Sequence, residues 1–570
     1  MSPKGTHSID MAGYGEPLPG APGHGERQPM AVVIIGGVAG GMSAATRLRR
    51  LDESARITII ERSGYVSFAN CGLPYHVGGV IGERDALLLQ TPQSLGERFK
   101  LDVRVRHEAV RIDRDRRVVV VRDLDGGTDA ELPYDALILS PGASPVLPRI
   151  PGIERALSLR SMEDADRLVA AASDARTALV IGGGFVGLEM AENLVHRGLA
   201  TLVVEATAQV MAPLDPEMAE LVHRRIRHAK VDLRLGSGVT SIDATHVTLA
   251  TGERLPADLV MAAIGVRPET GLAGGAGLAI GPRGGIVIDE HFRTSDPHIY
   301  AVGDAVEKRD GLDGSEALIP LANTANRQGR FVADVIAGRP GTDRGVYGTA
   351  IVGVFGLQVA TTGWNEKRLR AAGRPYLAVH THPSSHAGYY PGADGMALKL
   401  LLDPGTDRIL GAQGVGKSGI DKRIDVIATA MAGNLTASDL ADLELAYAPQ
   451  FSSAKDPVNM LGYAAMNARS GLTPTIEWHE LQAAMSQGAA LVDVRSREEH
   501  RRGAIPGSIL IPVDELRDRL DEVPSGPVVV HCAVGIRGHA ATRILRQRGW
   551  DRVRNLDGGY ATWAAGTGRP

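Results

Sequence analysis

The sequence predicts an α/β protein with four structured units, and three observations lead to this expectation. An apolar strand, a glycine-rich turn, a helix and a second strand occur in that order twice, beginning at Met30 and at Ala178. After Gly348 the pattern changes to an α+β segment that reaches about Leu472. From Thr473, strands alternate with helices in a pattern typical of a small separate α/β domain. A chain of 570 residues is long enough for about four domains of roughly 150 residues each.

Composition excludes several classes of protein. The net charge of −4 argues against a general nucleic-acid binder, and no apolar run approaches the ~20 residues that a membrane helix needs. Residues 1–29 are rich in Gly, Pro, Ser and His without an apolar core, which predicts a disordered extension rather than a secretory signal. The chain has only two cysteines, far apart in sequence, so we expect a reducing, cytoplasmic location.

The second glycine-rich turn has the full G-x-G-x-x-G spacing, with glycines at positions 182, 184 and 187. The first glycine permits the tight turn, the second lets a pyrophosphate approach the backbone, and the third lets the helix pack on the strand. The helix N-terminus then offers free N–H groups to phosphate. Glu205 ends the next strand, where an acid accepts hydrogen bonds from a ribose and repels a 2′-phosphate. This unit therefore predicts a Rossmann-like NADH site.

The first turn departs from this spacing. It supplies Gly36 and Gly41, but Val38 occupies the middle position, and Glu61 ends the following strand. The alternative reading is that both turns serve packing only. The complete strand–turn–helix–strand context in both copies favours dinucleotide binding, and two such sites in one chain suggest an electron path from a nicotinamide to a flavin.

The order of these motifs resembles the pyridine nucleotide–disulfide oxidoreductase family, from Met30 to about Tyr463, with "HIYAVGDA" closing the two-unit block. The resemblance implies that the FAD site comes first and that Asp304 binds the ribityl chain. It implies an FAD-binding domain at 30–148 and 283–346, an NAD(P)H-binding domain at 149–282 and a dimerisation domain at 347–472. The residues that it places at the two cofactors are Gly36, Gly37, Val38, Ala39, Gly40, Gly41, Glu61, Arg62, Gly182, Gly184, Gly187, Glu205, Gly303, Asp304 and Tyr447.

Cys71 is the single cysteine of the region where most members of that family carry a redox pair. The stretch "SFANCGLPY" resembles the S-F-x-x-C-x-x-P motif of coenzyme A disulfide reductases and related NADH-dependent persulfide reductases. NADH oxidases and peroxidases share the same single cysteine. The alternative is a buried structural thiol, the commonest fate of a free cysteine. The motif favours a redox-active thiolate at Cys71.

Ser43, Arg47 and Arg50 fall at i, i+4 and i+7, which places them on one helical face. Two guanidinium groups and a hydroxyl could hold the phosphates of coenzyme A, although a solvated basic face is the simpler alternative. The resemblance favours substrate binding. The residues predicted to contact coenzyme A are Ser43, Arg47, Arg50, Ser67, Asn70 and Lys455.

Tyr389 and Tyr447 lie in stretches that resemble the dimerisation motifs of coenzyme A disulfide reductases. The resemblance implies that tyrosines of the second subunit protonate the departing thiolate, as a phenol can. The active unit would then be a homodimer. The alternative is that both tyrosines only pack at the interface.

A second nucleotide motif is present at Gly411–Ser418, where "GAQGVGKS" satisfies G-x-x-x-x-G-K-S. Taken alone it indicates a phosphate-binding loop. It lies inside the segment that resembles the dimerisation domain, and no Mg²⁺-binding acidic strand follows. We therefore expect it not to bind nucleotide.

Cys532 follows an apolar strand and precedes a helix, so the loop C-A-V-G-I-R can turn its N–H groups toward the sulfur. This stretch resembles a single rhodanese domain over about Thr473–Trp563, within the unit 473–570. The resemblance implies that Cys532 carries sulfane sulfur as a persulfide and that Arg537 helps to hold the loop's anion. A phosphatase of similar fold would need C-x5-R, whereas the spacing here is C-x4-R.

Together these features predict an NADH-dependent FAD flavoprotein that reduces persulfides, polysulfides and coenzyme A disulfide through Cys71, with no metal. NADPH as the donor stays open, as does the direction of any sulfur transfer between Cys71 and Cys532. One alternative is an NADH oxidase or peroxidase that uses the same cysteine. The other is a sulfur-relay protein with a regulatory flavin part.

Overall fold

The computed structural model describes residues 28–340 and 343–569. Nearly all of the predicted N-terminal extension, residues 1–27, lies outside the described residues. Within the described ranges no helix is both long enough and apolar enough to cross a membrane.

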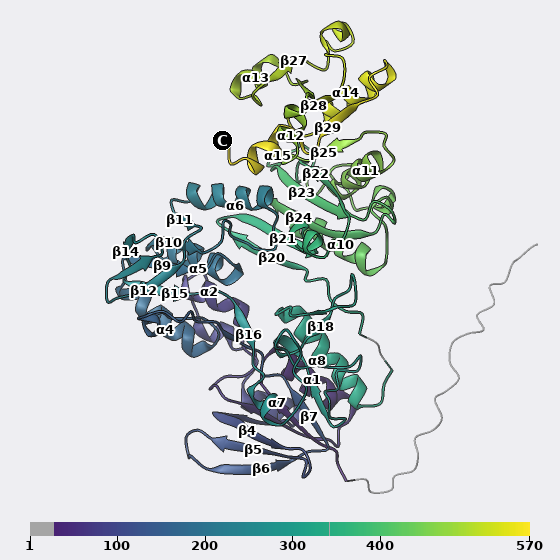
Figure 1. The fold of residues 1–570 in the computed structure, drawn as a ribbon. Helices are drawn as coiled ribbons and strands as arrows, with labels where there is room; N and C mark the ends of the chain where they lie inside the picture. The colour runs from purple at the N-terminus through teal and green to yellow at the C-terminus, as the bar shows by residue number, and fades with distance from the viewer. Residues whose placement is uncertain (1–27, 341–342, 570) are drawn as a thin grey trace, which may run out of the picture.

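The first unit is built on a parallel sheet in the order β17-β7-β1-β2-β3. Its central strand is fully apolar, and the helix after it packs with its small residues against helix α8. An antiparallel sheet, β4-β5-β6, lies at the edge of this unit (Figure 1). The bounds are β1 Ala31–Ile35, α1 Ala39–Leu51, β2 Arg56–Glu61, η1 Asn70–Gly72, α2 Leu73–Val77, α3 Pro92–Phe99, β3 Asp102–Val105, β4 His107–Asp113, β5 Val118–Asp123, β6 Asp129–Pro133, β7 Ala136–Leu139, β17 Ile299–Ala301 and α8 Ala322–Ile336.

The second unit repeats the arrangement with a parallel sheet in the order β11-β10-β9-β15 and a small antiparallel sheet, β12-β13-β14. Helix α5 follows the glycine turn, and helix α6 lies across the upper side of this unit, next to α15 of the fourth unit (Figure 1). The bounds are α4 Met162–Asp174, β9 Thr177–Ile181, α5 Phe185–His196, β10 Ala200–Glu205, α6 Pro216–His228, β11 Asp232–Leu235, β12 Val239–Ile242, β13 His246–Leu249, β14 Arg254–Pro256 and β15 Leu259–Ala262. Two short strands, β8 Ala143–Pro145 and β16 Val266–Pro268, pair between the first and second units.

The third unit is an antiparallel sheet in the order β20-β21-β24-β23-β22, covered by α10 and α11. The bounds are β20 Ala350–Val354, β21 Leu357–Gly363, α9 Glu366–Ala371, β22 Leu377–Thr381, β23 Met396–Leu402, β24 Ile409–Gly416, α10 Ile420–Ala432 and α11 Pro457–Arg469. The motif at Gly411–Ser418 is mostly strand β24, which is buried and paired on both sides. A Cβ on Gly411 would lie 2.1 Å from the carbonyl oxygen of Trp364, so packing explains this glycine.

The fourth unit is an all-parallel sheet in the order β25-β29-β28-β26-β27 with helices on both sides. Parallel sheets are normally buried on both faces, and β28 is buried along its whole length and apolar apart from its final histidine. The bounds are β25 Thr475–Ile476, α12 Leu481–Ser486, β26 Ala490–Asp493, α13 Arg497–Arg502, β27 Ser508–Leu510, β28 Val528–His531, α14 Ile536–Gln547, β29 Val553–Leu556 and α15 Gly559–Gly566. The four-unit α/β fold class is thus confirmed.

The four units stack along the molecule. The first lies at the bottom, the second at the left, the third above them, and the fourth at the top, where its helix α15 lies beside α6 (Figure 1). The fourth unit contacts the second through α6, and the third through the bond from the N–H of His380 to Asp557, although only the short segment Ser470–Pro474 joins it to α11.

Candidate active site

One cavity of about 1910 Å³ runs between the first and second units and reaches both glycine turns. Its wall includes Gly36, Gly184, Cys71 and Asp304, which lie far apart in sequence. The paired units thus place two nucleotide-type turns and one thiol around a single space. This size exceeds that of most small-molecule pockets and suits more than one large ligand.

The first glycine turn is held by close backbone packing. Gly36 has φ +100°, and a Cβ on it would lie 2.1 Å from the carbonyl oxygen of Ser140. A Cβ on Gly41 would lie 1.9 Å from the carbonyl oxygen of Gly36, so the helix can approach the strand only with glycine there. Val38, at the middle position, lies at the N-cap of α1 and lines the cavity. Glu61 accepts the N–H of Gly37 at 2.8 Å.

The second turn has the same construction. Gly182 has φ +109°, and a Cβ on Gly187 would lie 2.1 Å from the carbonyl oxygen of Gly182. A Cβ on Gly184 would meet nothing within 4 Å, so the space in front of this N-cap glycine is open. Glu205 accepts the N–H of Gly183 at 2.8 Å and, through its other oxygen, the N–H of Thr207 at 2.8 Å.

The lining suits two dinucleotides. Asp304 presents a buried carboxylate oxygen, Oδ1, that has no hydrogen-bond partner within the described residues, as a ligand hydroxyl would require. Next to it, the N–H of Gly303 is bonded to the buried Gln328 at 2.9 Å, which fixes the backbone of this turn. Most of the predicted cofactor residues of the two turns therefore meet at one cavity, whereas Gly37, Gly41, Gly187 and Tyr447 do not line it. The basic side chains that line the cavity all come before the second glycine turn in the sequence. They are Arg62, Arg106, His107 and Arg160.

The Cys71 segment is anchored to the first glycine turn. The N–H of Ser67 donates to the carbonyl of Gly37 at 2.8 Å, and Ser67 adopts φ +48°, a left-handed conformation that is uncommon for a non-glycine residue. The chain then enters the short helix η1, where the Cys71 side chain is exposed and opens into the cavity. Asn70 accepts the N–H of Cys71 at 3.1 Å through its side-chain oxygen, which also lies 3.7 Å from the Cys71 sulfur.

Glu189 and Tyr75, which sequence reasoning missed, lie close to Cys71. Desolvation and the carboxylates of Glu189 and Asp304 raise the pKa of the Cys71 thiol. Burial also raises the pKa of Glu189, which lines the cavity and accepts the Tyr75 hydroxyl at 3.1 Å. The protein's own groups thus favour the thiol over the expected thiolate. The sequence feature that could have indicated Glu189 is its position two residues after Gly187, the last glycine of the second turn.

The predicted coenzyme A residues are not gathered at one point. Ser43 donates to Asn326 at 2.7 Å and Arg47 is paired with Asp334 at 2.6 Å, both on α8. Arg50 is exposed and its guanidinium lies 5.8 Å from the centre of the Phe99 ring. These three side chains therefore do not act together on one helical face, because Ser43 and Arg47 are bonded to acceptors on α8 and Arg50 is not. Lys455 is exposed on the third unit.

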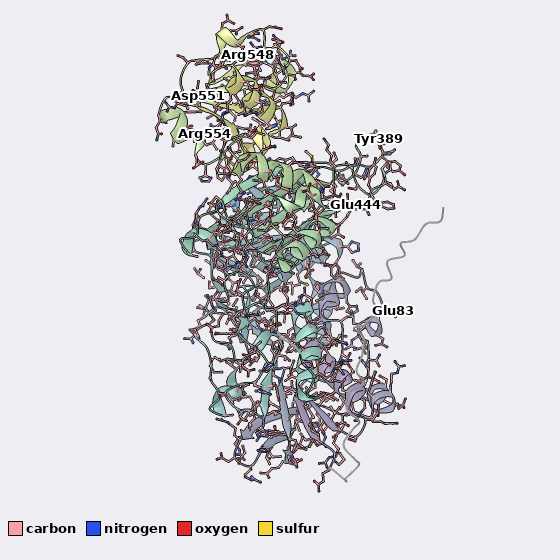
Figure 2. All side chains as sticks on the ribbon, turned by 90° about the vertical axis from the view of Figure 1, so that its right-hand side faces the viewer. Glu83, Tyr389, Glu444, Arg548, Asp551 and Arg554 are labelled. Atoms are coloured by element: carbon pink, nitrogen blue, oxygen red, sulfur yellow. The ribbon has the colours of Figure 1, made fainter. Side chains whose placement is uncertain are left out.

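The two predicted tyrosines lie together, outside the cavity. The hydroxyl oxygens of Tyr389 and Tyr447 are 2.9 Å apart, and the side chains are 76% and 47% exposed. Figure 2 shows Tyr389 on a projection from the body of the molecule. This hydrogen bond raises the pKa of Tyr447. Neither tyrosine lines the space that holds Cys71 of the same chain.

Cys532 is fully buried at the end of β28. The N–H of Gly535 donates to its sulfur at 3.2 Å, and Gly535 has φ +94°, which turns the loop around the sulfur. Arg537 forms a two-pronged ion pair with Glu499 of α13, at 2.8 and 2.6 Å. That pairing lowers the pKa of Glu499 to about 2. Sequence reasoning missed Glu499, because nothing in the loop motif points to α13.

Comparisons with known proteins agree with this architecture. The family model described as pyridine nucleotide-disulphide oxidoreductase matches residues 30–329, its dimerisation domain matches residues 349–457, and the rhodanese-like domain matches residues 477–566. The coenzyme A disulfide reductase of Staphylococcus haemolyticus is 34% identical over 438 residues, which is 76% of this chain and 99% of the relative.

Two solved structures extend the similarity through the fourth unit. The reduced CoADR-RHD of Bacillus anthracis is 48% identical, with a TM-score of 0.93, and the match covers 95% of this chain and 98% of that one. The NAD-dependent persulfide reductase from A. fulgidus is 40% identical, with a TM-score of 0.88, and the match covers 94% of this chain and 100% of that one. The chain therefore belongs to the pyridine nucleotide-disulphide oxidoreductase family and carries a rhodanese-like domain after its dimerisation domain.

Proposed function

We propose that this protein is an NADH-dependent FAD enzyme that reduces coenzyme A disulfide and persulfides at Cys71. One observation carries the proposal: the only cysteine of the first three units opens into the cavity that both glycine turns line. The relatives named coenzyme A disulfide reductase and persulfide reductase support the substrate class. A lone thiol must form its redox bond with a substrate sulfur, since Cys532 is buried in another unit.

The first turn would hold FAD, with Glu61 and Arg62 beside it and Asp304 at its ribityl chain. The second turn would hold the nicotinamide nucleotide, with its pyrophosphate at the N-terminus of α5. Bound flavin supplies a path for two electrons from the nicotinamide to sulfur. The protein's part is to position the two nucleotides and the thiol around one space.

At Cys71 the chain contributes a nucleophile and proton control. The thiolate attacks the substrate's S–S bond and the second sulfur leaves as a thiolate. The Glu189 carboxylate, which accepts the Tyr75 hydroxyl and whose pKa is raised by burial, is suited to take up the proton that Cys71 loses. Tyr389 or Tyr447 of a second subunit would protonate the leaving sulfur, because neither reaches Cys71 within one chain.

The match to a dimerisation domain supports a homodimer. Its surface exposes several large apolar side chains that a partner subunit would cover. These are Tyr389, Tyr390, Tyr447, Phe451, Tyr463 and Met466.

NADH is the favoured donor. Ala206 and Thr207 follow Glu205 in the cavity wall, and the lining supplies no cation there for a 2′-phosphate. The two free cysteines fit action in a reducing compartment, the cytoplasm.

In the fourth unit we propose that Cys532 carries sulfane sulfur. A buried sulfur that accepts a backbone N–H can hold an anionic persulfide, and Arg537 adds a nearby positive charge. The match to a rhodanese-like domain supports this role.

The decisive experiment is NADH consumption measured side by side with coenzyme A disulfide, coenzyme A persulfide, polysulfide and oxygen, in the wild type and in Cys71→Ser. We expect rapid turnover of the sulfur substrates and its loss in Cys71→Ser, with yellow FAD retained. Faster turnover of oxygen than of every sulfur substrate would instead establish the oxidase alternative. Absence of NADH turnover with all four, alongside active Cys532, would favour the sulfur-relay alternative.

A further inference from the structure

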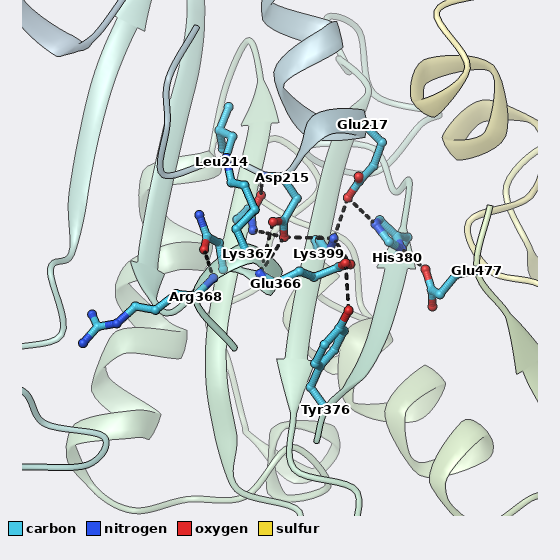
Figure 3. Close-up of polar contacts among 12 residues, drawn as sticks. Leu214, Asp215, Glu217, Glu366, Lys367, Arg368, Tyr376, His380, Lys399 and Glu477 are labelled. Carbon is cyan, nitrogen blue, oxygen red and sulfur yellow. Dashed lines mark hydrogen bonds and ion pairs between the residues drawn. The ribbon is translucent and has the colours of Figure 1, made fainter. Parts of the chain in front are cut away.

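The rhodanese-like unit meets the rest of the chain at buried polar side chains, and Figure 3 shows His380 between Glu217 of α6 and Glu477 of the rhodanese-like unit. His380, on β22 of the third unit, lies between two carboxylates. Its Nε2 is 3.1 Å from Glu217 of α6, and its Nδ1 is 2.5 Å from Asp557 of the rhodanese-like unit. The backbone N–H of His380 donates to the same Asp557 oxygen at 2.9 Å. Trp478 adds a hydrogen bond to Glu217 at 3.2 Å.

Asp557 opens the turn that supports the Cys532 loop. Gly558 and Gly559 follow it, both with left-handed φ, of +63° and +64°. A Cβ on Gly558 would lie 2.8 Å from the Cβ of His380, and a Cβ on Gly559 would lie 2.6 Å from the carbonyl oxygen of Cys532. Two glycines thus let one turn contact both a neighbouring domain and the sulfur-bearing loop.

The backbone after these glycines holds the loop directly. The N–H of Tyr560 donates to the carbonyl of Cys532 at 2.8 Å, and the N–H of Ala561 donates to the carbonyl of Ala533 at 2.9 Å. The side chain of Asp557 is therefore fixed by His380, while the peptide groups three and four residues later fix the loop. A displacement of Asp557 would be transmitted to Cys532 through a few rigid bonds.

The carboxylates around His380 face cationic side chains, and Glu477 of the rhodanese-like unit also faces the ring, with its Oε2 4.0 Å from Nδ1. Lys399 lies 2.5 Å from Glu217, 2.5 Å from Glu366 and 3.0 Å from Asp215, so an ammonium group already occupies that carboxylate cluster. Both ring nitrogens of His380 are already bonded to carboxylates. Although burial opposes it, the carboxylates raise the pKa of His380 to about 10, so its imidazolium donates both hydrogen bonds.

We propose that His380 and Asp557 are positioning residues for the Cys532 loop, so that sulfur transfer in the rhodanese-like unit depends on a residue of the dimerisation domain. This inference rests on the proposed role of Cys532 as a sulfur carrier. A rhodanese-like unit that moved freely on its linker would not have this dependence. Here the turn that supports the Cys532 loop is also the turn that contacts the dimerisation domain.

The test uses the full-length protein and thiosulfate with cyanide. The Cys532 thiolate takes the sulfane sulfur of thiosulfate and releases sulfite; cyanide then removes that sulfur as thiocyanate and regenerates the thiolate. We expect Asp557→Ala and His380→Ala each to lower kcat for thiocyanate formation about tenfold or more, as small displacements of a reacting group do. Asp557→Asn should recover most of the rate, since its amide oxygen still accepts from His380. NADH-dependent reduction of coenzyme A disulfide by Asp557→Ala should be unchanged.

The matched control is Trp478→Phe, which removes one hydrogen bond at the same junction without touching Asp557 and should transfer sulfur normally. Wild-type transfer by both alanine variants overturns the inference, as does an Asp557→Asn variant as slow as Asp557→Ala. If Asp557→Ala fails to fold, His380→Ala, whose substitution lies outside the rhodanese-like unit, decides the question. Failure of the wild type to form thiocyanate would refute the role of Cys532 itself and the inference with it.

Discussion

Glu205 accepts the backbone N–H of Gly183 at 2.8 Å, in the same way that Glu61 accepts that of Gly37. Each acid thus closes its glycine turn from the end of the neighbouring strand. At Glu205 the carboxylate also faces the cavity, where a nicotinamide nucleotide would present its ribose. The acid therefore stabilises the turn, and under the proposed function it also selects NADH; mutation can separate these two roles.

We predict that Glu205→Gln keeps the bond from Gly183, because its amide oxygen still accepts, but loses the bond from the Thr207 N–H and the negative charge. KM for NADPH should then fall relative to KM for NADH, and adding Ala206→Arg should extend the change by supplying a cation for the 2′-phosphate. Steady-state kinetics with both donors measures this. An unchanged NADH/NADPH ratio in the double variant would show that selectivity lies elsewhere.

The thiol of Cys71 gives a prediction about pH. Desolvation inside the cavity and the carboxylates of Glu189 and Asp304 raise its pKa, so the reactive thiolate fraction is small at neutral pH and grows as pH rises. Removing one negative charge with Glu189→Gln should shift the inflection of the Cys71 alkylation rate to lower pH. Iodoacetamide kinetics in a Cys532→Ser background would follow it.

The control for this measurement is Glu192→Gln, three residues further along the same helix. Glu192 accepts the N–H of Phe355 at 2.7 Å, and a glutamine preserves that bond. Its profile should match the parent protein. A shift equal to that of Glu189→Gln would mean that the helix, not the Glu189 carboxylate, controls the thiol.

The coenzyme A hypothesis also has a direct test. Replacing both Arg47 and Arg50 by Ala should raise KM for coenzyme A disulfide at least about tenfold, while KM for inorganic polysulfide stays the same, since charged hydrogen bonds are worth about 1.5–3 kcal/mol each. Arg56→Ala, an exposed arginine at the start of β2, is the control. Equal losses with both substrates would indicate that the Arg47–Asp334 pair serves α1–α8 packing alone.

The domain junction predicts a pH limit for stability. The pKa of His380 is raised to about 10 in the folded protein, against about 6.5 when unfolded. Its contribution to the free energy of unfolding is therefore complete below about pH 6.5 and is lost as pH rises through about 10. Thermal melts from pH 6 to 10.5 should show a decline in the wild type that is weaker in His380→Ala. Parallel curves would contradict this assignment.

The sequence was most informative where the backbone itself imposes the residue. Gly182 and Gly187 could be identified because the turn admits no Cβ, and that requirement is local. The fate of Arg47 could not be predicted in this way, because its partner Asp334 lies 287 residues away and helical periodicity says nothing about the neighbouring helix. The phosphate-loop motif at Gly411 shows the opposite problem, since glycines spaced for a loop here serve the close packing of a buried strand.

The charged site between domains was also invisible in the sequence. His380 and Asp557 are 177 residues apart and belong to no motif. Likewise, the glycine turn predicts where Glu189 lies on α5, but its proximity to Cys71 depends on how α2 packs against α5. Tertiary packing brings such charges together, and no local sequence pattern predicts which charges will meet.

The contacts that hold the rhodanese-like unit determine what happens when a protease cuts the linker before it. The segment Ser470–Pro474 is partly exposed, as preferred sites of proteolytic nicking are. A protease that cuts there would break the covalent connection but not the contacts of His380, Trp478 and α15 with the body. The nicked protein would therefore keep its fourth unit in place as a non-covalent complex, because the contacts between the units hold them together without the peptide.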